Sequence, residues 1–444
     1  MEQDLTQGTV SRALIRFVLP FLAASILQFL YSVVDMIIVG QFADPAAISA
    51  VNTSGQIMQM ITGLVSGIAT GGTVLIGQAI GRKRQEDVRH TIGAMLVIFL
   101  TTAALLTAGL LAANHGLVTL MQVPEAAVAS AQSYLWICSL GSVFIVCYNG
   151  VSGILRGLGD SKHPMYFVAC SCGINIVGDL ILVGGFGLGA AGAALATVFA
   201  QATACILSLF VLQRGEYKIT KTMWEPHLNK VWAVLRLGIP VAAQDCLTTL
   251  SFLLITAIVN GMGLEKSAAV GVVERIIGFC MLVPIAFLSA LSAFTAQNAG
   301  AGKPERTSAG LKISIELCVL FSASFCLLAE LIPGGLMRMF TQDAAVIQNG
   351  AAYLRTYSLD ILMVAFVFCL NGFFSGYGRT GFTMANCLIA TFLIRVPLVY
   401  GISFIPGVSL TLIGLAAPLA SAGQIVMQLV YYKVGKWRKV EVQS

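Results

Sequence analysis

The stretch ILMVAFVFCL at positions 361–370 is continuously apolar. A strand of an outer-membrane barrel alternates polar and apolar residues over about ten positions, so this run favours a helix. Similar runs recur along the whole chain of 444 residues, which is 57% hydrophobic and only 10% charged, with a mean hydropathy of +0.87. Soluble domains carry about 25% charged residues. The composition therefore excludes a water-soluble globule and predicts an all-α, polytopic integral membrane protein.

Twelve transmembrane helices are predicted when the chain is divided at its charged and Pro/Gly-rich breaks. They cover residues 14–39, 48–78, 91–113, 131–155, 165–186, 190–212, 231–260, 267–296, 309–332, 351–375, 382–404 and 410–433. Basic side chains gather in every second loop, for example Arg82, Lys83 and Arg84 after the second span and Lys303 after the eighth. The positive-inside rule then predicts a multi-pass protein of the cell membrane with both termini in the cytoplasm.

An internal repeat organises these spans. A single constant shift, the one that carries Gln78 onto Gln297, aligns identical residues along both halves. The other aligned pairs are Gly81 with Gly300, Glu86 with Glu305, Tyr134 with Tyr353, Ser139 with Ser358, Gly153 with Gly372, Gly157 with Gly376 and Gly159 with Gly378. The chain is therefore an internal duplication. Each copy holds an even number of spans, so both copies insert the same way up.

The repeat predicts two parallel six-helix bundles. We expect an N-terminal lobe over residues 1–215, a cytoplasmic linker over residues 216–230 and a C-terminal lobe over residues 231–444. Parallel repeats of this kind are typical of carriers that work by alternating access, with substrate bound near the middle of the bilayer. The duplication therefore favours a transporter.

Other classes of function leave no trace in the sequence. The chain has no phosphate-binding loop of the form GxxxxGK[ST], no HExxH and no Gly-x-Ser-x-Gly, so we expect neither an enzyme nor a cofactor. The net charge of +6 is dispersed through short loops, which argues against a nucleic-acid partner. Membrane lipids and small molecules are the expected partners. The energy for transport would come from an ion gradient or from the gradient of the substrate.

Ionisable residues inside predicted spans are the functional candidates, because they are rare there. Asp35 lies in the first span, and Asn175 and Asp179 lie one turn apart in the fifth. Thr197 in the sixth span and Asn149 in the fourth add further oxygens. Carboxylate, amide and hydroxyl oxygens suit a sodium ion, and paired buried carboxylates suit a proton. The residues predict a site for one of these ions; the alternative is that the acids only bond to neighbouring helices.

The second copy lacks this pair of acids, since the shift carries Asp35 and Asp179 onto apolar residues. Ion coupling is therefore expected in the first half. The second half has its own polar residues inside spans, and we assign Asp245, Asp360 and Arg395 to a substrate cavity. Neutralisation of one of these acids by Arg395 is the simplest alternative.

Four stretches resemble the multidrug and toxic compound extrusion (MATE) family. They are LPFLAASILQFLYSVVDMIIVGQF at residues 19–42, GQAIGRKR at 77–84, ILRGLGDSKHPM at 154–165 and FSGYGRTGFTM at 374–384. The resemblance extends over nearly the whole chain. It implies a cation-coupled antiporter that exports organic cations, drugs and other amphipathic compounds in exchange for an inward proton or sodium ion, and we expect a monomer.

The resemblance also carries over to single residues. It implies a cation site in the N-terminal lobe, on the first, fifth and sixth helices, at Asp35, Asn175, Asp179 and Thr197, with Asn149 as a neighbour. A sodium ion would be bound by Asp35, Asn175, Asp179 and Thr197. Some members of the family also carry a Glu in helix seven and an Asp in helix ten of the C-terminal lobe. Here Asp245 comes early in its helix and Asp360 does not sit securely at that spacing, so the resemblance leaves a second cation site open.

Two other kinds of carrier stay open. A major facilitator carrier also has six plus six helices, but its expected Asp-Arg pair is missing from GQAIGRKRQED at residues 77–87. A flippase for lipid-linked oligosaccharides of the same superfamily would need several cationic side chains in its cavity, and only Arg275 and Arg395 qualify. Neither the substrate nor the choice between sodium and proton follows from the residues.

Overall fold

The computed structural model describes residues 4–220, 223 and 227–438. Within these residues it contains twelve helical segments that are long and apolar enough to cross a membrane, which confirms the predicted number of spans. The described chain has no β-strand. The protein is therefore an all-α, multi-pass membrane protein.

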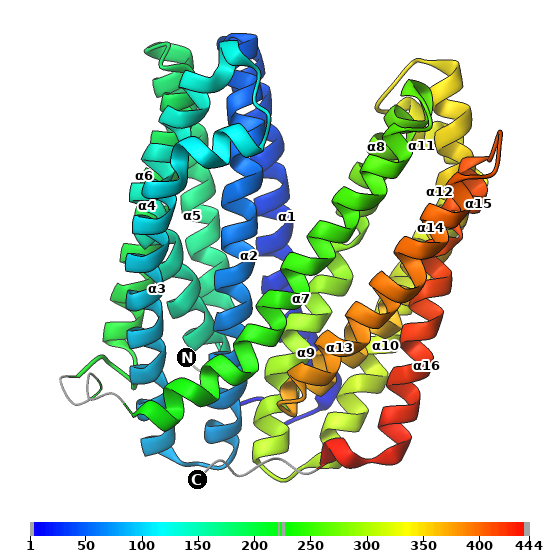
Figure 1. The fold of residues 1–444 in the computed structure, drawn as a ribbon. Coiled ribbons are helices and arrows are strands. Elements are labelled where there is room, and N and C mark those ends of the chain that lie inside the picture. The colour runs from blue at the N-terminus through cyan, green and yellow to red at the C-terminus, as the bar shows by residue number, and fades with distance from the viewer. Residues whose placement is uncertain (1–3, 221–222, 224–226, 439–444) are drawn as a thin grey trace. The chain divides into compact units, whose positions relative to one another are not determined.

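The first of two compact units is formed by Leu19–Ala242. Its helices are α1 (Val10–Phe42), α2 (Pro45–Gly81), α3 (Gln85–Leu120), α4 (Glu125–Gly157), α5 (Lys162–Asp179), the π-helical segment η1 (Leu180–Gly185) and α6 (Gly189–Arg214) (Figure 1). α4 packs against α2, α3 and α6 and is the central helix of this unit.

The second unit combines Leu5–Val18 with the chain from Ala243 onward. Its helices are α7 (Leu228–Asn260), α8 (Leu264–Cys280), α9 (Leu282–Gly300), α10 (Pro304–Leu331), α11 (Pro333–Arg338), α12 (Ala344–Gly376), α13 (Thr380–Leu388), the π-helical segment η3 (Ile389–Arg395), α14 (Val396–Ser403), α15 (Leu410–Gly414), α16 (Ala416–Val434) and the short 3₁₀ helix η4 (Lys436–Arg438). α1 and α7 each begin in one unit and end in the other. The lobe boundaries predicted at residues 215 and 230 follow the sequence repeat and stay a prediction.

The helix bounds follow the repeat closely. The shift that carries Gln78 onto Gln297 carries α4 onto Ala344–Gly376, which are the bounds of α12. The same shift carries α2 onto Leu264–Gly300, the segment that α8 and α9 cover together. The duplication inferred from scattered identical residues is thus a duplication of whole helices.

Equivalent glycines make equivalent helix contacts in the two units. A Cβ atom added at Gly157 of α4 would lie 2.9 Å from the carbonyl oxygen of Thr73 in α2. A Cβ atom added at Gly376 of α12 would lie 2.7 Å from the carbonyl oxygen of Ser292 in α9. The repeat shift takes each glycine and each partner onto its counterpart. Both glycines therefore let two helix backbones approach closely, as small residues do in membrane bundles.

Replacing Gly376 with alanine should destabilise the protein, because the added methyl group would overlap the backbone of α9 and the Cβ atom of Thr295, 2.5 Å away. Overpacking of this kind costs about 1–3 kcal/mol. Gly109→Ala in α3 is the matched control, since nothing lies within 4 Å of its added Cβ and alanine is the better helix former. Thermal unfolding in detergent measures both; an equal melting temperature for the two variants would contradict the close contact.

The start of the described chain is tied to the second unit by hydrogen bonds. The side chain of Arg306 donates to the carbonyl oxygens of Leu5 at 3.2 Å, Gln7 at 3.1 Å and Gly8 at 2.7 Å. Asn298 donates to the same Leu5 oxygen at 3.1 Å, and the Leu5 N–H donates to Gln297 at 3.2 Å. These contacts fix where α1 begins, and α1 carries Asp35 in the first unit.

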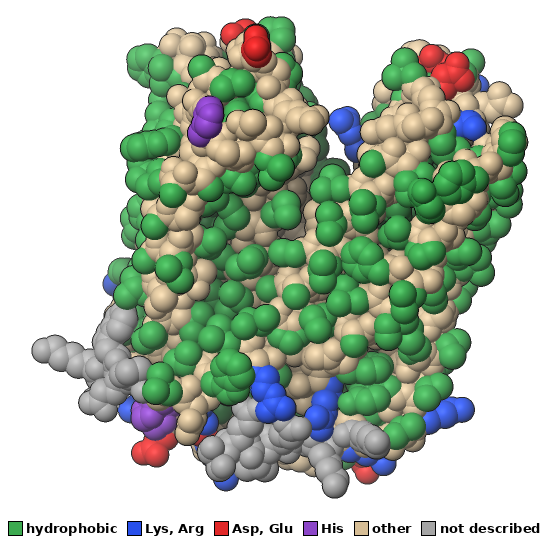
Figure 2. Space-filling view, in the orientation of Figure 1, with side chains coloured by type: hydrophobic (Ala, Val, Ile, Leu, Met, Phe, Trp, Pro, Cys, Tyr) green, Lys and Arg blue, Asp and Glu red, His purple; other side chains and the backbone are tan. Residues whose placement is uncertain are grey.

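Apolar side chains cover the outer surface of the helices. Figure 2 shows hydrophobic side chains along their middle parts, and Lys, Arg, Asp and Glu side chains near their ends. Leu105, Leu327 and Leu393 are among the large apolar residues that remain exposed. Such a surface is unfavourable in water and favourable in lipid, as the hydropathy of the chain predicts.

Candidate functional site

Two acidic side chains, one from α1 and one from the end of α5, lie in the interior of the first unit. Asp35 lies well inside α1 and is half-buried. Asp179 is the last residue of α5, where the helix widens into the π-helical segment η1, and its side chain is fully buried. Single π-helical turns inside helices are frequent at functional sites. The π-helical segment that follows Asp179 thus supports a functional role for this residue.

Asn175 links Asp179 to α6. The amide orientation that satisfies both of its ends lets the nitrogen donate to Oδ2 of Asp179 at 3.0 Å. In the same orientation the amide oxygen accepts from the backbone N–H of Thr197 at 3.3 Å. Asn175 is fully buried, like Asp179. The predicted i, i+4 pair therefore lies on one face of α5 and is joined to the helix that carries Thr197.

The carboxyl groups of Asp35 and Asp179 lie close enough for their charges to interact. Oδ1 of each residue is buried and has no hydrogen-bond partner among the described residues. A carboxylate can only accept hydrogen bonds, so two facing carboxylates repel unless a proton or a cation lies between them. The two carboxyl groups thus have oxygen atoms that are available to bind a proton or a cation.

Tyr31 joins this group, and the sequence interpretation missed it. Its hydroxyl group lies near the side chain of Thr197 and close enough to Asp35 and Asp179 to interact with their charges. Tyr31 lies one turn before Asp35, on the same face of α1. The four-residue spacing from Asp35 is the sequence pattern by which Tyr31 could have been predicted as a site residue. Tyr31, Asp35, Asp179 and Thr197 therefore come from three helices and meet at one place.

The amide nitrogen of Asn149 makes a contact within its own helix, and its place near the cation site stays a prediction. Its amide donates to the carbonyl oxygen of Ile145 in the same helix at 2.8 Å. A buried polar side chain in a helix often satisfies itself in this way. The structure thus brings Tyr31, Asp35, Asp179 and Thr197 together with Asn175. For Asn149 it shows only that the amide nitrogen donates within α4.

A small cavity lies beside Thr197 in the first unit. Its volume is about 30 Å³, which is the space of about one water molecule. The lining residues are Met58, Tyr134, Cys138, Gly141, Ile145, Thr197, Val198 and Gln201. This cavity beside Thr197 therefore has room for a guest of atomic size.

Among the described residues, the buried acid of the second unit, Asp360, has a basic side chain near it, unlike the two interior acids of the first unit described above. Asp360 is buried, accepts a hydrogen bond from Ser421 and is attracted by Arg395. Arg395 also donates to the hydroxyl group of Tyr357 at 2.9 Å and lies 4.5 Å from the ring centre of Phe252. Asp360 and Arg395, predicted as cavity residues, thus lie close enough for their charges to attract each other.

The assignment of Asp245 to the same cavity stays a prediction. Its side chain is exposed on α7, and its carbonyl oxygen accepts a hydrogen bond from Thr249 at 3.0 Å. Glu274, which was not assigned to the cavity, also interacts with Arg395 by charge. The sequence could not show this, because Glu274 and Arg395 lie far apart along the chain.

Comparison with known proteins assigns the family. The family model described as MatE matches residues 20–181 and 240–401. The chain belongs to the MatE family. The two matched segments begin at Pro20 and Pro240, which are equivalent positions of the internal repeat to within one residue. The resemblance expected from the motifs is confirmed, the major facilitator alternative is excluded, and this MatE protein is a transporter, not an enzyme.

Relatives of known name support this assignment over the full length of the chain. The probable multidrug resistance protein YpnP of Bacillus subtilis (strain 168) is 24% identical over 439 residues, which are 99% of this chain and 98% of that protein. An FAD transporter of Shewanella oneidensis (strain MR-1) is 24% identical over 422 residues, which are 93% and 92% of the two chains. This MatE chain thus spans nearly the whole of each relative.

A solved structure shows the same fold. It is described as the outward-facing conformation of a multidrug resistance MATE family transporter of the MOP superfamily, and it aligns with a TM-score of 0.89 at 22% identity. The alignment covers 99% of this chain and 98% of the other. The predicted fold of two parallel six-helix repeats is therefore confirmed for this MatE chain.

Proposed function

We propose that this MatE chain is an antiporter that exports organic cations, drugs and other amphipathic small molecules in exchange for an inward proton or sodium ion. Export of drugs is supported by the multidrug resistance proteins among its relatives. Coupling to a cation rests on one observation: Asp35 and Asp179 face each other in the first unit, and no basic side chain of the described chain compensates them there.

The neighbouring side chains fit the same role. A guest cation at Asp35 and Asp179 would also meet the hydroxyl group of Thr197. Asn175 would hold the Asp179 carboxyl group in place through its 3.0 Å hydrogen bond. Oxygen ligands of this kind suit sodium, and a shared proton would relieve the repulsion between the acids equally well. The set therefore supports ion binding without choosing between the two ions.

We further propose that the protein works as a monomer in the cell membrane with both termini in the cytoplasm. The alternation of basic and nearly uncharged loops supports this orientation. Substrate would be released outward while the coupling ion enters. Membrane lipids are the surroundings expected for the exposed apolar side chains.

Transport by the purified protein in liposomes tests this proposal. We expect a fluorescent organic cation to move only when a proton gradient or a sodium gradient is imposed in the opposite direction, each being imposed separately. An ionophore that removes the gradient should return transport to the level of protein-free liposomes. Transport that ignores both gradients would contradict coupling to a cation.

The same liposomes separate the two kinds of substrate that the relatives suggest. An organic cation and FAD, the substrate named for the Shewanella relative, should be compared in parallel under the gradient that drives transport. The proposal expects faster transport of the organic cation. Exclusive transport of FAD would replace the proposed substrate class with an anionic dinucleotide.

A further inference from the structure

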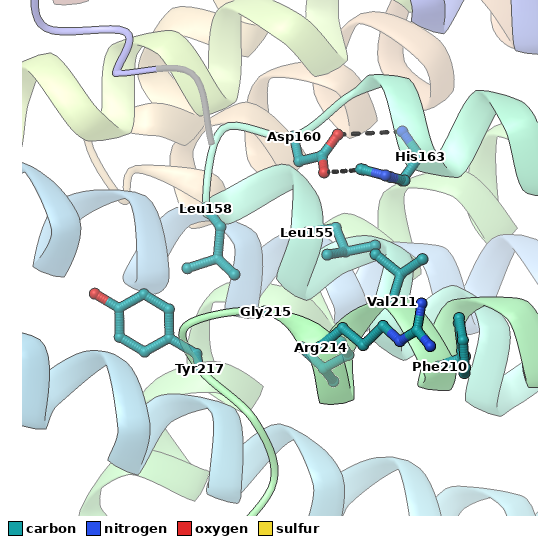
Figure 3. Close-up of a pocket in the computed structure, with 10 residues that line it drawn as sticks. Leu155, Leu158, Asp160, His163, Phe210, Val211, Arg214, Gly215 and Tyr217 are labelled. Atoms are coloured by element: carbon teal, nitrogen blue, oxygen red, sulfur yellow. Dashed lines mark hydrogen bonds and ion pairs between the residues drawn. The ribbon is translucent and has the colours of Figure 1, made fainter. Parts of the chain in front are cut away.

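A second and larger cavity opens at the ends of the helices in the first unit. Its volume is about 340 Å³. It is lined by the end of α4, the loop that follows, the first turn of α5 and the end of α6, as Figure 3 shows. The lining residues are Leu155, Leu158, Asp160, His163, Phe210, Val211, Leu212, Arg214, Gly215 and Tyr217. Cavities of this size hold small ligands or single chemical groups of larger ones.

The acid in this cavity is already compensated. Oδ1 of Asp160 accepts hydrogen bonds from the backbone N–H groups of Lys162 and His163, both at 3.1 Å. Its other oxygen binds the Nδ1 atom of the His163 ring, and Figure 3 shows both contacts with His163. Asp160 therefore serves to cap the start of α5, and its carboxylate is held by partners of its own.

The cation in this cavity lacks such a partner. The guanidinium group of Arg214 lies 4.0 Å from the ring centre of Phe210, and no acidic side chain of the described chain forms an ion pair with it. The nearby Glu216 instead accepts a hydrogen bond from Gln85 at 3.5 Å. Stacking on Phe210 positions the guanidinium group and leaves its N–H donors available to an anion.

Apolar side chains form the rest of the cavity wall. Leu155 and Leu158 come from α4 and the residue after it, and Val211 and Leu212 come from α6. Phe210 is 51% exposed, so the cavity borders on the lipid-facing surface of α6. A cation beside an apolar wall at the end of membrane helices matches the polar head and first carbons of a lipid better than it matches a free ion in water.

We propose that this cavity binds the phosphate group of an anionic membrane lipid, with Arg214 contacting the phosphate and the leucine and valine side chains contacting the carbons next to it. Basic pockets between membrane helices bind anionic headgroups by this chemistry. A lipid bound here would join the start of α5 to the end of α6. These are the helices that carry Asn175, Asp179 and Thr197.

Native mass spectrometry of the full-length protein tests the proposal, with short-chain phosphatidylglycerol, short-chain phosphatidylcholine and inorganic phosphate as separate probes. We expect phosphatidylglycerol to bind more tightly than phosphatidylcholine. Arg214→Gln should weaken that binding about fivefold, the effect of one basic side chain near an anionic lipid. Arg214→Lys keeps the charge and should restore most of it.

Lys218→Gln is the matched control, because Lys218 is exposed on the same segment and does not line the cavity. It should leave phosphatidylglycerol binding unchanged. Equal affinities for the two lipids, or equal losses in Arg214→Gln and Lys218→Gln, would overturn the proposal. Competition by inorganic phosphate at the same concentration as the lipid would also overturn it, since a lipid site must use the apolar wall.

Discussion

Asp179→Asn and Asp35→Asn should each reduce ion-driven transport to the level of protein-free liposomes, while the protein still inserts and folds. Asparagine has nearly the shape of aspartate, so the packing of α5 and α1 is kept. It carries no negative charge, so the remaining carboxyl group no longer has a partner with which to hold a proton or a sodium ion. Removing one of two facing acids should also leave the melting temperature in detergent unchanged or raise it.

Glu316→Gln is the control for a general effect of charge. Glu316 lies on α10, and its exposed side chain is 3.9 Å from that of Lys312. Exposed pairs of this kind contribute little, about 0–1 kcal/mol. This variant should therefore retain most of its transport. Equal losses in all three variants would mean that the acids serve assembly of the protein and not coupling.

The fold was predictable because hydropathy and the repeat are carried by many residues. Twelve apolar segments and one constant offset between the two halves are enough to place whole helices, and α12 follows from α4 without further information. Breaks and π-helical turns within single helices could not be predicted in the same way. The span predicted over 267–296 is divided near Met281 into α8 and α9, and α5 continues into a π-helical turn. Such changes in hydrogen-bond register leave the apolar pattern intact, so hydropathy cannot detect them.

The candidate site was predictable where local spacing decides the geometry. Asn175 and Asp179 share a face of α5 because they are one helical turn apart. Asn149 was assigned to the same group because a buried amide on a neighbouring helix has an oxygen that can bind a cation; its nitrogen donates within its own helix, and its part in the site stays a prediction. The proximity of Asp360 to Arg395 depends on how helices pack, and no local pattern contains that information.

Drug and coupling ion should weaken each other's binding. If the ion binds between Asp35 and Asp179, its contacts draw together α1, α5 and α6, and the glycine-rich stretch at positions 183–192, where α5 gives way to α6, lets these helices adjust. A drug bound to the conformation without the ion then opposes this change. Reciprocal linkage requires that the ion weakens drug binding by the same factor by which the drug weakens ion binding. Coupling energies of this kind correspond to about 5–150-fold changes in affinity.

We therefore expect the affinity for a drug, measured in detergent by fluorescence or calorimetry, to fall as pH decreases or as sodium increases, according to which ion is coupled. The sign follows from the chemistry: lower pH loads the carboxyl pair with a proton, and more sodium loads it with the metal ion, so either change favours the conformation that excludes the drug. Asp179→Asn should bind the drug with an affinity that no longer depends on that ion, because the pair that takes up the ion is broken. An unmutated protein whose drug affinity is unchanged by both ions would contradict direct competition through this pair, and coupling, if present, would then act through other residues.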